Sequence, residues 1–199
     1  MKIYKIADAW YKFTPTVTLY HGTTEDNLNA ILSEGFQPFD PSKKVDEVLN
    51  RYGYSRDTVP PWVWQQEMNL RQRTPFIFFT TLKPQAASYS KKPFGEFETS
   101  IVDRINIWLK EQEQEKLATP EYKSVVITVE APWDKIKSYK TLEEYKETVK
   151  RVEQLDKDET NEEYLTDLAF EFWLDQPLSP DHIVKWEYSD TMKDLWQNP

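Results

Sequence analysis

The sequence has no cysteine, and only four glycines and two histidines among its 199 residues. Without cysteine the chain can form no disulfide, no thiolate nucleophile and no cysteine-ligated metal site. The few glycines form no phosphate-cradling motif, and neither histidine has a second histidine at metal-ligand spacing. We therefore expect no metal site and no glycine-rich phosphate loop.

The chain also lacks any apolar run near the roughly 20 residues that a membrane-spanning helix needs. Its amino terminus lacks the apolar core of a signal peptide, so we expect a cytoplasmic protein, or one delivered into a host cytoplasm. Basic residues are in the minority, with 25 lysines and arginines against 34 aspartates and glutamates and a formal net charge of -9. This charge opposes attraction to phosphate backbones and makes nucleic acid a disfavoured partner.

Material for a core is plentiful, since 39% of the residues are hydrophobic and 15% are aromatic. A chain of this length fills one core more readily than two. We expect a single domain over residues 1–199 that works as a monomer.

Strand patterns and helix patterns mix irregularly along the chain, which favours an α+β fold. Strands are expected at 16–22, 75–81, 122–132, 170–178 and 182–188. Helices are expected at 23–36, 83–90, 100–116 and 141–169, the last broken near 156–160, with short helices at 45–53 and 62–73. The proline-containing segment PFDPSKK (38–44) is expected to be a loop.

Three side chains beside the expected strands are candidates for chemistry: His21, Tyr89 and Glu171. Each also has a structural alternative. His21 would then be a satisfied strand-end histidine and Tyr89 an ordinary core aromatic. Glu171 stands between LAF and FWL, where an unpaired charge is costly to bury, so it needs a functional cleft or an outward-facing register.

The segments around these residues resemble the ADP-ribosyltransferases of the diphtheria-toxin-like and poly(ADP-ribose)-polymerase-like type, which are named for a histidine, a tyrosine and a glutamate. The similar segments are LYHGTT (19–24), FFTTLKPQAASYS (78–90) and EFWLDQPLSPDHI (171–183). They occur in the family's order along nearly the whole chain, while the long segments between them match nothing in the family.

The resemblance implies a split β-sheet with NAD in its cleft. It implies that His21 bonds a ribose hydroxyl of the adenosine half, that the Gly22 backbone binds the nicotinamide carboxamide, and that Tyr89 stacks on the nicotinamide ring. Glu171 would be the catalytic carboxylate, stabilising the positive charge that develops on the ribose as nicotinamide leaves. Further pocket-lining positions implied by the resemblance are Thr23, Thr80 and Ser90.

The resemblance also bears on the acceptor. Arginine-specific relatives carry glutamate or glutamine two residues before the catalytic glutamate, and this chain has Ala169 there. Arginine is therefore a disfavoured acceptor, and the expected partner is a macromolecule, foremost a protein. Transfer to nucleic acid, simple NAD hydrolysis and a catalytically silent binding module are the alternatives.

Overall fold

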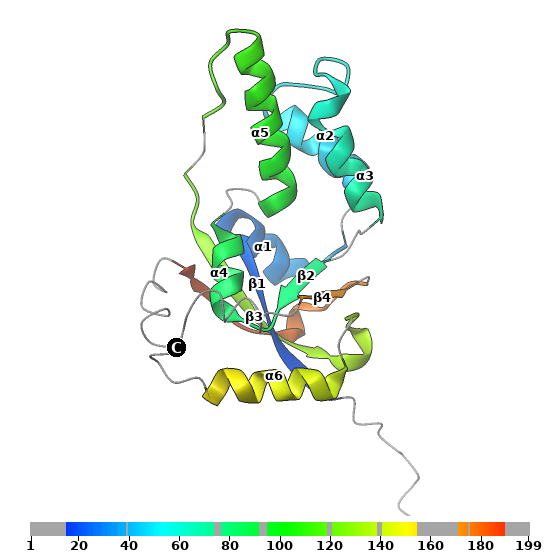
Figure 1. The fold of residues 1–199 in the computed structure, drawn as a ribbon, viewed down its shortest axis with the longest axis vertical. Helices are drawn as coiled ribbons and strands as arrows, with labels where there is room; N and C mark the ends of the chain where they lie inside the picture. Colours follow the sequence, from blue (N-terminus) through cyan, green and yellow to red (C-terminus); the bar gives the residue numbers. More distant parts are fainter. Residues whose placement is uncertain are drawn as a thin grey trace, which may run out of the picture.

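A computed structural model of the chain describes most residues from position 15 onward (Figure 1). The described ranges are 15–38, 40–73, 77–91, 95–118, 121–138, 141–154, 171–174 and 176–189. The side chains at 71–73, 96, 152–154 and 171 lie outside this description.

A five-stranded antiparallel sheet with strand order β4-β2-β1-β3-β5 organises one half of the molecule. The strands are β1 (Thr16–Thr24), β2 (Ile77–Thr80), β3 (Ser124–Pro132), β4 (Glu171–Leu174) and β5 (Ile183–Tyr188). β1 pairs with β3 along its whole length, but its register with β2 contains a single pair, Tyr20 opposite Thr80. The described sheet is therefore continuous on one side of β1 and opens on the other.

One face of the sheet carries the main core, which α1 (Glu25–Glu34) and α6 (Leu142–Gln154) cover (Figure 1). Alternate residues of β1 point into this core, and Leu19 is 1% exposed. α1 follows β1 directly and ends at Gly35, whose φ of 75° is the left-handed conformation that glycine tolerates best. The strand at 16–22 and the helix at 23–36 are thus confirmed, with ends shifted by two residues.

The opposite face of the sheet is covered by α4 (Lys83–Ser90). Ala86 and Ala87 pack against Val126 of β3, and Tyr20 of β1 lies partly buried beside them. These two alanines are small enough to bring the α4 backbone close to the sheet.

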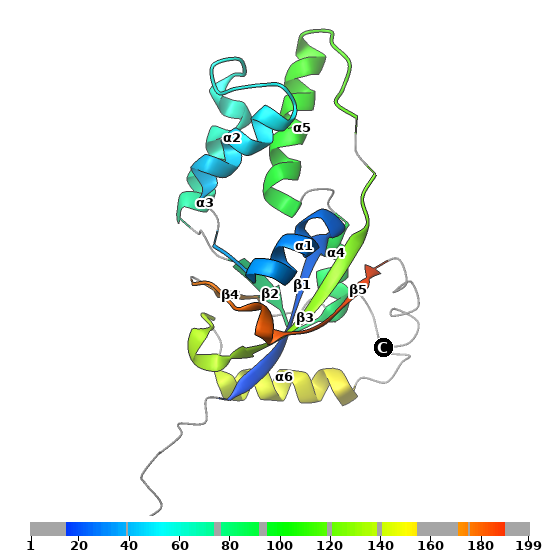
Figure 2. The ribbon, with the colours of Figure 1, turned by 180° about the vertical axis from the view of Figure 1, so that it is seen from behind.

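A second group of helices, which we call the helical lobe, has its own apolar core. The lobe consists of α2 (Pro41–Arg51), the 3₁₀ turn η1 (Pro61–Val63), α3 (Gln65–Arg73) and α5 (Gly95–Glu111). Its fully buried residues include Val45, Leu49, Val63, Ile101 and Ile105. Seen from behind, the lobe stands beyond the end of the sheet at which α1 begins (Figure 2).

The expected α+β class is confirmed, with local errors: the helix expected at 100–116 is α5 at Gly95–Glu111, and the strand expected at 170–178 is β4 at Glu171–Leu174. Segment 38–44 is not a loop, because α2 begins inside it at Pro41. Asp40 accepts hydrogen bonds from the backbone N–H groups of Ser42 and Lys43, and proline at the first helical position needs no N–H partner. The expected end of the acidic helix, 155–169, lies outside the described residues. No helix within the described ranges is long and apolar enough to cross a membrane.

Candidate functional site at the opening between β1 and β2

The opening in the sheet begins directly after the Tyr20–Thr80 pair. On one edge of β1 the odd-numbered residues bond toward β3, as the bond from Glu25 N–H to the Lys123 carbonyl shows. The even-numbered residues therefore direct their N–H and C=O groups to the other edge. Thr18 fits this alternation, since its backbone N and O both bond the Tyr145 hydroxyl at 3.0 Å. The Gly22 backbone N–H and C=O accordingly point toward the opening.

His21 spans this opening. Its Nδ1 lies 2.8 Å from the backbone oxygen of Phe78, the residue that would face Gly22 if the β1–β2 ladder continued. A carbonyl oxygen only accepts hydrogen bonds, so Nδ1 carries the proton and Nε2 of the neutral ring is an acceptor. The ring is wedged between Phe36 and Phe79, with centroids 5.1 and 5.4 Å away.

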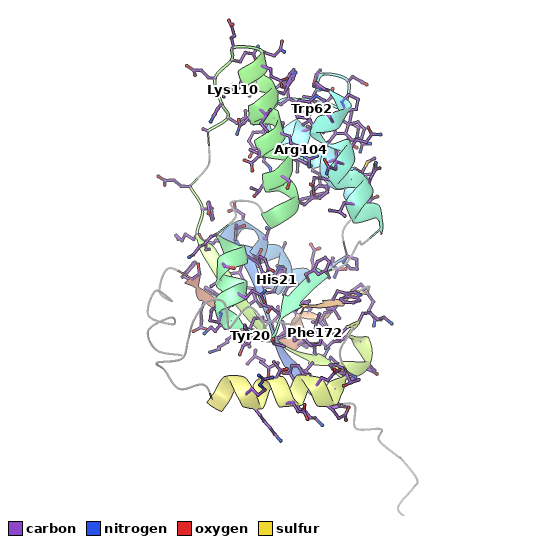
Figure 3. All side chains as sticks on the ribbon, viewed as in Figure 1. Tyr20, His21, Trp62, Arg104, Lys110 and Phe172 are labelled. Carbon is purple, nitrogen blue, oxygen red and sulfur yellow. The ribbon has the colours of Figure 1, made fainter. Side chains whose placement is uncertain are left out.

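The surroundings of His21 keep its ring neutral. Burial lowers the pKa of His21 below its usual 6.5, and the Phe78 carbonyl only partly offsets this effect. The residue as a whole is nevertheless only partly buried. In Figure 3, His21 lies with Tyr20 and Phe172 in the sheet half of the molecule. A neutral imidazole with an acceptor nitrogen suits a hydroxyl group as its ligand.

Gly22 lies directly under α4. A Cβ atom there would collide with the Ala86 backbone oxygen and would lie 2.8 Å from the Ser90 backbone nitrogen. The missing side chain thus serves the packing of α4 on β1, which the sequence did not indicate. Because Gly22 points its backbone toward the opening, this close packing also places α4 at the edge of the opening.

α4 carries Tyr89, which is 37% exposed. Thr80 Oγ1 donates a hydrogen bond to Gln85 Oε1, and Gln85 Nε2 lies 3.4 Å from the Tyr89 hydroxyl. Thr80 Oγ1 also accepts from the Leu82 backbone N–H at 3.2 Å and so fixes the start of the helix. The sequence did not identify Gln85 as a residue of the site. Its position one helical turn before Tyr89 is the one sequence feature that indicates contact between the two side chains.

Glu171 is the first residue of β4, and its backbone pairs with Thr80 of β2. Paired residues of antiparallel strands occupy the same face, so the register places residue 171 on the α4 face of the sheet. The next residue, Phe172, is fully buried on the opposite, main-core face. The Glu171 side chain itself lies outside the described residues.

The register position of Glu171 lies beside Thr80 on the α4 face, and Tyr89 is linked to Thr80 through Gln85. By strand alternation His21 belongs to the other face, together with Leu19, and it reaches the site through the gap between the strands. The three residues named from the sequence therefore do not share one face of the sheet: His21 belongs to the main-core face, and Tyr89 and the register position of residue 171 belong to the α4 face.

All three expected pocket-lining residues are enclosed, and Thr80 is 2% exposed. Ser90 is 1% exposed and its hydroxyl donates to the Ala87 carbonyl at 2.8 Å, while its own carbonyl accepts from Ser124. Thr23 is 5% exposed and lies on the His21 face of β1. The Ser90 and Thr23 side chains therefore contribute to the packing of α4 and β1 beside the opening and do not line it.

A cavity of about 370 Å³, which we call the interlobe cavity, lies where β1 ends and the helical lobe begins. It is lined from the sheet side by Thr24, Asp26 and Asn27 and from the helical lobe mainly by Arg51, Tyr52 and Glu98. Glu98 is 2% exposed and pairs with the Arg51 guanidinium. Burial raises the pKa of Glu98, against the opposing effect of Arg51.

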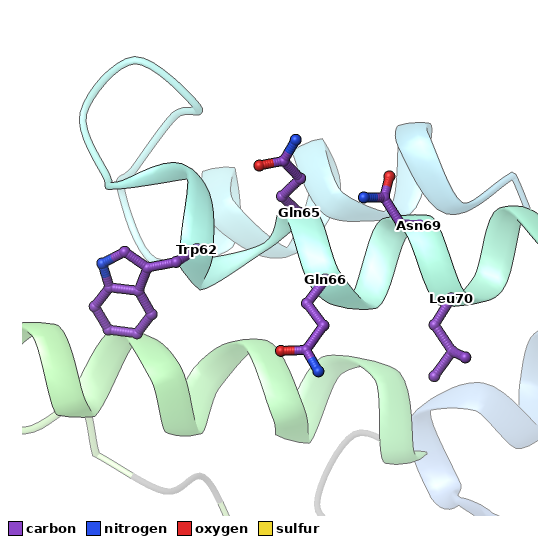
Figure 4. Close-up of a pocket in the computed structure, with 5 residues that line it drawn as sticks. All are labelled: Trp62, Gln65, Gln66, Asn69 and Leu70. Atoms are coloured by element: carbon purple, nitrogen blue, oxygen red, sulfur yellow. The ribbon is translucent and has the colours of Figure 1, made fainter.

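Another cavity, of about 460 Å³, lies on the outer surface of the helical lobe (Figure 4). Trp62, Gln65, Gln66, Asn69 and Leu70 line it, at the spacing of one helix face. It carries no charged side chain among these residues and is remote from the opening in the sheet.

Within the described ranges, no three acidic, histidine or cysteine side chains are grouped to hold a metal ion. No family model matches the sequence, and neither a curated protein nor a solved structure matches the chain. The function proposed next therefore depends on the residues and their geometry.

Proposed function

We propose that the protein is an NAD-dependent ADP-ribosyltransferase. In this reaction the bond between the nicotinamide nitrogen and the ribose C1′ breaks, nicotinamide leaves, and C1′ bonds to a nucleophilic atom of the acceptor, which loses a proton. The observation that supports the proposal is the opening between β1 and β2, which His21 bridges and toward which the Gly22 backbone points, with Tyr89 linked through Gln85 to Thr80, the residue that pairs with the start of β4.

The opening offers the contacts that a nicotinamide riboside needs. The Gly22 N–H and C=O form a donor and acceptor pair that matches the carboxamide group. The exposed ring of Tyr89 provides a flat wall for the nicotinamide. Next to these contacts, the acceptor Nε2 of His21 suits a ribose hydroxyl of the adenosine half of NAD.

Glu171 is the proposed catalytic residue. Cleavage of the ribose–nicotinamide bond develops positive charge on the sugar, and a nearby carboxylate stabilises that charge in the transition state. The same carboxylate can accept the proton of the incoming nucleophile. The register of β4 supports this role because it places residue 171 beside Thr80, which is linked through Gln85 to Tyr89.

The interlobe cavity is the proposed site of the adenosine half of NAD. Thr24 lies two residues after Gly22 on β1, a distance of about 7 Å along a strand. A dinucleotide with its nicotinamide at Gly22 can therefore extend along β1 toward Thr24 and into this cavity. Thr24, Asn27 and Tyr52 supply hydroxyl and amide groups there.

A protein side chain is the proposed acceptor. The formal net charge of -9 disfavours a nucleic-acid acceptor, because phosphate groups would be repelled on approach. Hydrolysis, in which water replaces the acceptor, would use the same residues and is an outcome that the assay below separates.

The proposal is tested by mixing the protein with NAD and measuring nicotinamide release. Labelled ADP-ribose is then followed into pools of protein and of nucleic acid. We expect Glu171→Gln to lower the rate about 100-fold or more, the scale of one electrostatic catalytic group. Glu147→Gln, at an exposed position of α6, is the matched control and should leave the rate unchanged.

Release of nicotinamide without labelled macromolecules would identify a hydrolase. If calorimetry shows no NAD affinity and no nicotinamide appears, the protein is a silent module and the proposal fails. Full activity of Glu171→Gln would overturn the catalytic assignment.

A further inference from the structure

The Arg51–Glu98 pair joins two helix ends at the wall of the interlobe cavity. Arg51 is the last residue of α2 and Glu98 lies in the first turn of α5. Each charge is therefore favourable for the dipole of its own helix. The Glu98 side chain is 3% exposed and that of Arg51 is 48% exposed, so the carboxylate is enclosed while the guanidinium reaches the cavity surface.

This pair is costly as a purely structural device. The enclosed Glu98 carboxylate loses its hydration while Arg51 stays half exposed, and apolar residues of similar volume often serve stability as well as a buried charge or better. The core of the helical lobe beside it is apolar, with Ile101 fully buried one turn along α5 from Glu98. A carboxylate retained at a cavity wall instead fits a role in ligand recognition.

We infer that Glu98 selects NAD over its 2′-phosphorylated form at the interlobe cavity. This inference rests on the proposed function, which places the adenosine half of NAD in that cavity. Carboxylates accept hydrogen bonds from ribose hydroxyls, and an acidic side chain at the adenosine ribose is a known chemical means of choosing NAD. A 2′-phosphate adds negative charge and would be repelled.

The position of Arg51 explains why Glu98 is needed for this choice. An arginine in such a cavity is well suited to a phosphate, because its planar fork matches phosphate oxygens. Glu98 pairs with that guanidinium, and Asp26 adds a second carboxylate to the cavity wall. Two acids against one arginine leave no excess positive charge for an additional phosphate.

Replacing Glu98 with glutamine removes one negative charge beside the Arg51 guanidinium and makes the cavity wall more positive by one charge. The cavity should then accept a 2′-phosphate that the native protein rejects. Asp26→Asn should act in the same direction but more weakly, because Asp26 is exposed to solvent. Because Asp26 is exposed, this second variant tests the inference without disturbing a buried pair.

The test uses two ligands that differ by one phosphate, AMP and adenosine 2′,5′-bisphosphate, titrated calorimetrically into the full chain. We expect the native protein to bind AMP at least about 10-fold more tightly, since like-charge contacts are strongly unfavourable at an enclosed site. In Glu98→Gln this ratio should fall to threefold or less. Glu111→Gln, at an exposed position of the same helix, is the control and should keep the native ratio.

The inference is wrong if native protein binds the two ligands equally or binds neither. It is also wrong if folded Glu98→Gln keeps the native ratio, or, should that variant not fold, if Asp26→Asn keeps it. Its failure is distinct from that of the proposed function. Equal nicotinamide release from NAD and NADP would contradict this inference and leave the proposed function standing. Selective AMP binding without any nicotinamide release would contradict the proposed transferase activity.

Discussion

The Nδ1 atom of His21 lies 2.8 Å from the backbone oxygen of Phe78, and this bond bridges the two strands where their ladder stops. A backbone carbonyl of β2 thus gains a side-chain partner where the continued register would have placed the Gly22 backbone. The imidazole of His21 therefore supplies the hydrogen bond of the Phe78 carbonyl and also forms part of the wall of the opening.

The first prediction concerns the stability that this bond supplies. His21→Ala removes a ring packed between Phe36 and Phe79 and takes a hydrogen bond from the Phe78 carbonyl. We expect a loss of about 2–4 kcal/mol in the free energy of unfolding, from the cavity and the lost bond together. Urea denaturation measures it. His182→Ala, which alters the second histidine, should change the free energy by less than about 0.5 kcal/mol.

The second prediction is a pH dependence of stability. Burial lowers the pKa of His21, so as the pH falls the unfolded chain binds the extra proton before the folded chain does. The contribution is complete above the unfolded pKa of about 6.5 and is lost at lower pH. Between pH 7.5 and 5.5 the loss should reach at most about 1.4 kcal/mol, which is one pKa unit of linkage.

The control for this pH effect is His21→Asn, whose amide can donate to the Phe78 carbonyl but does not titrate. Urea denaturation of both proteins at the two pH values gives the difference that belongs to His21. An equal pH dependence in the native protein and in His21→Asn would show that His21 does not hold a lowered pKa.

The third prediction tests the close contact between β1 and α4. In Gly22→Ala the new methyl group would meet the backbone of Ala86 and Ser90, and a helix backbone cannot turn aside as a flexible side chain does. We expect a destabilisation of about 1–3 kcal/mol, the usual cost of overpacking, together with reduced nicotinamide release because α4 also positions Tyr89. Thr16→Ala, at the exposed start of β1, should be close to neutral in both assays. Native stability in Gly22→Ala would mean that α4 does not pack this closely.

The sequence predicted the elements that surround the opening because their patterns are local. β1 and α1 are marked by strand alternation, a run of helix-forming residues and Gly35. β2 and α4 follow the same order, with a dense apolar strand and Pro84 in the first turn of the helix.

The helical lobe was less predictable. The Asp40–Pro41 pair looks like a turn, yet the same two residues are an N-cap and a first helical residue. Strand expectations also ran too long at the carboxyl-terminal end, where β4 is Glu171–Leu174. Leu178 instead forms an isolated bridge with Phe36.

The details of the site depend on contacts that no local pattern records. Glu98 reads as one more polar residue at the start of a helix, and its burial follows from Arg51, 47 residues earlier in the chain. The bond between His21 and Phe78 likewise crosses 57 residues. Only the assembled sheet shows that β1 and β2 part there.

The last prediction separates the ring of Tyr89 from its hydroxyl. The ring is 37% exposed on α4, so replacing it should cost little stability, and its proposed contribution is the stacking surface for nicotinamide. Tyr89→Ala should raise the KM for NAD about 5- to 100-fold, the range that stacking of one aromatic base on a side chain supports. Tyr89→Phe keeps the ring, loses the contact of the hydroxyl with Gln85, and should stay within about threefold of the native KM. Nicotinamide release at varied NAD concentration gives both values, and urea denaturation confirms that the variants are folded. If Tyr89→Phe were as impaired as Tyr89→Ala, the hydroxyl rather than the ring would be the group that NAD binding requires.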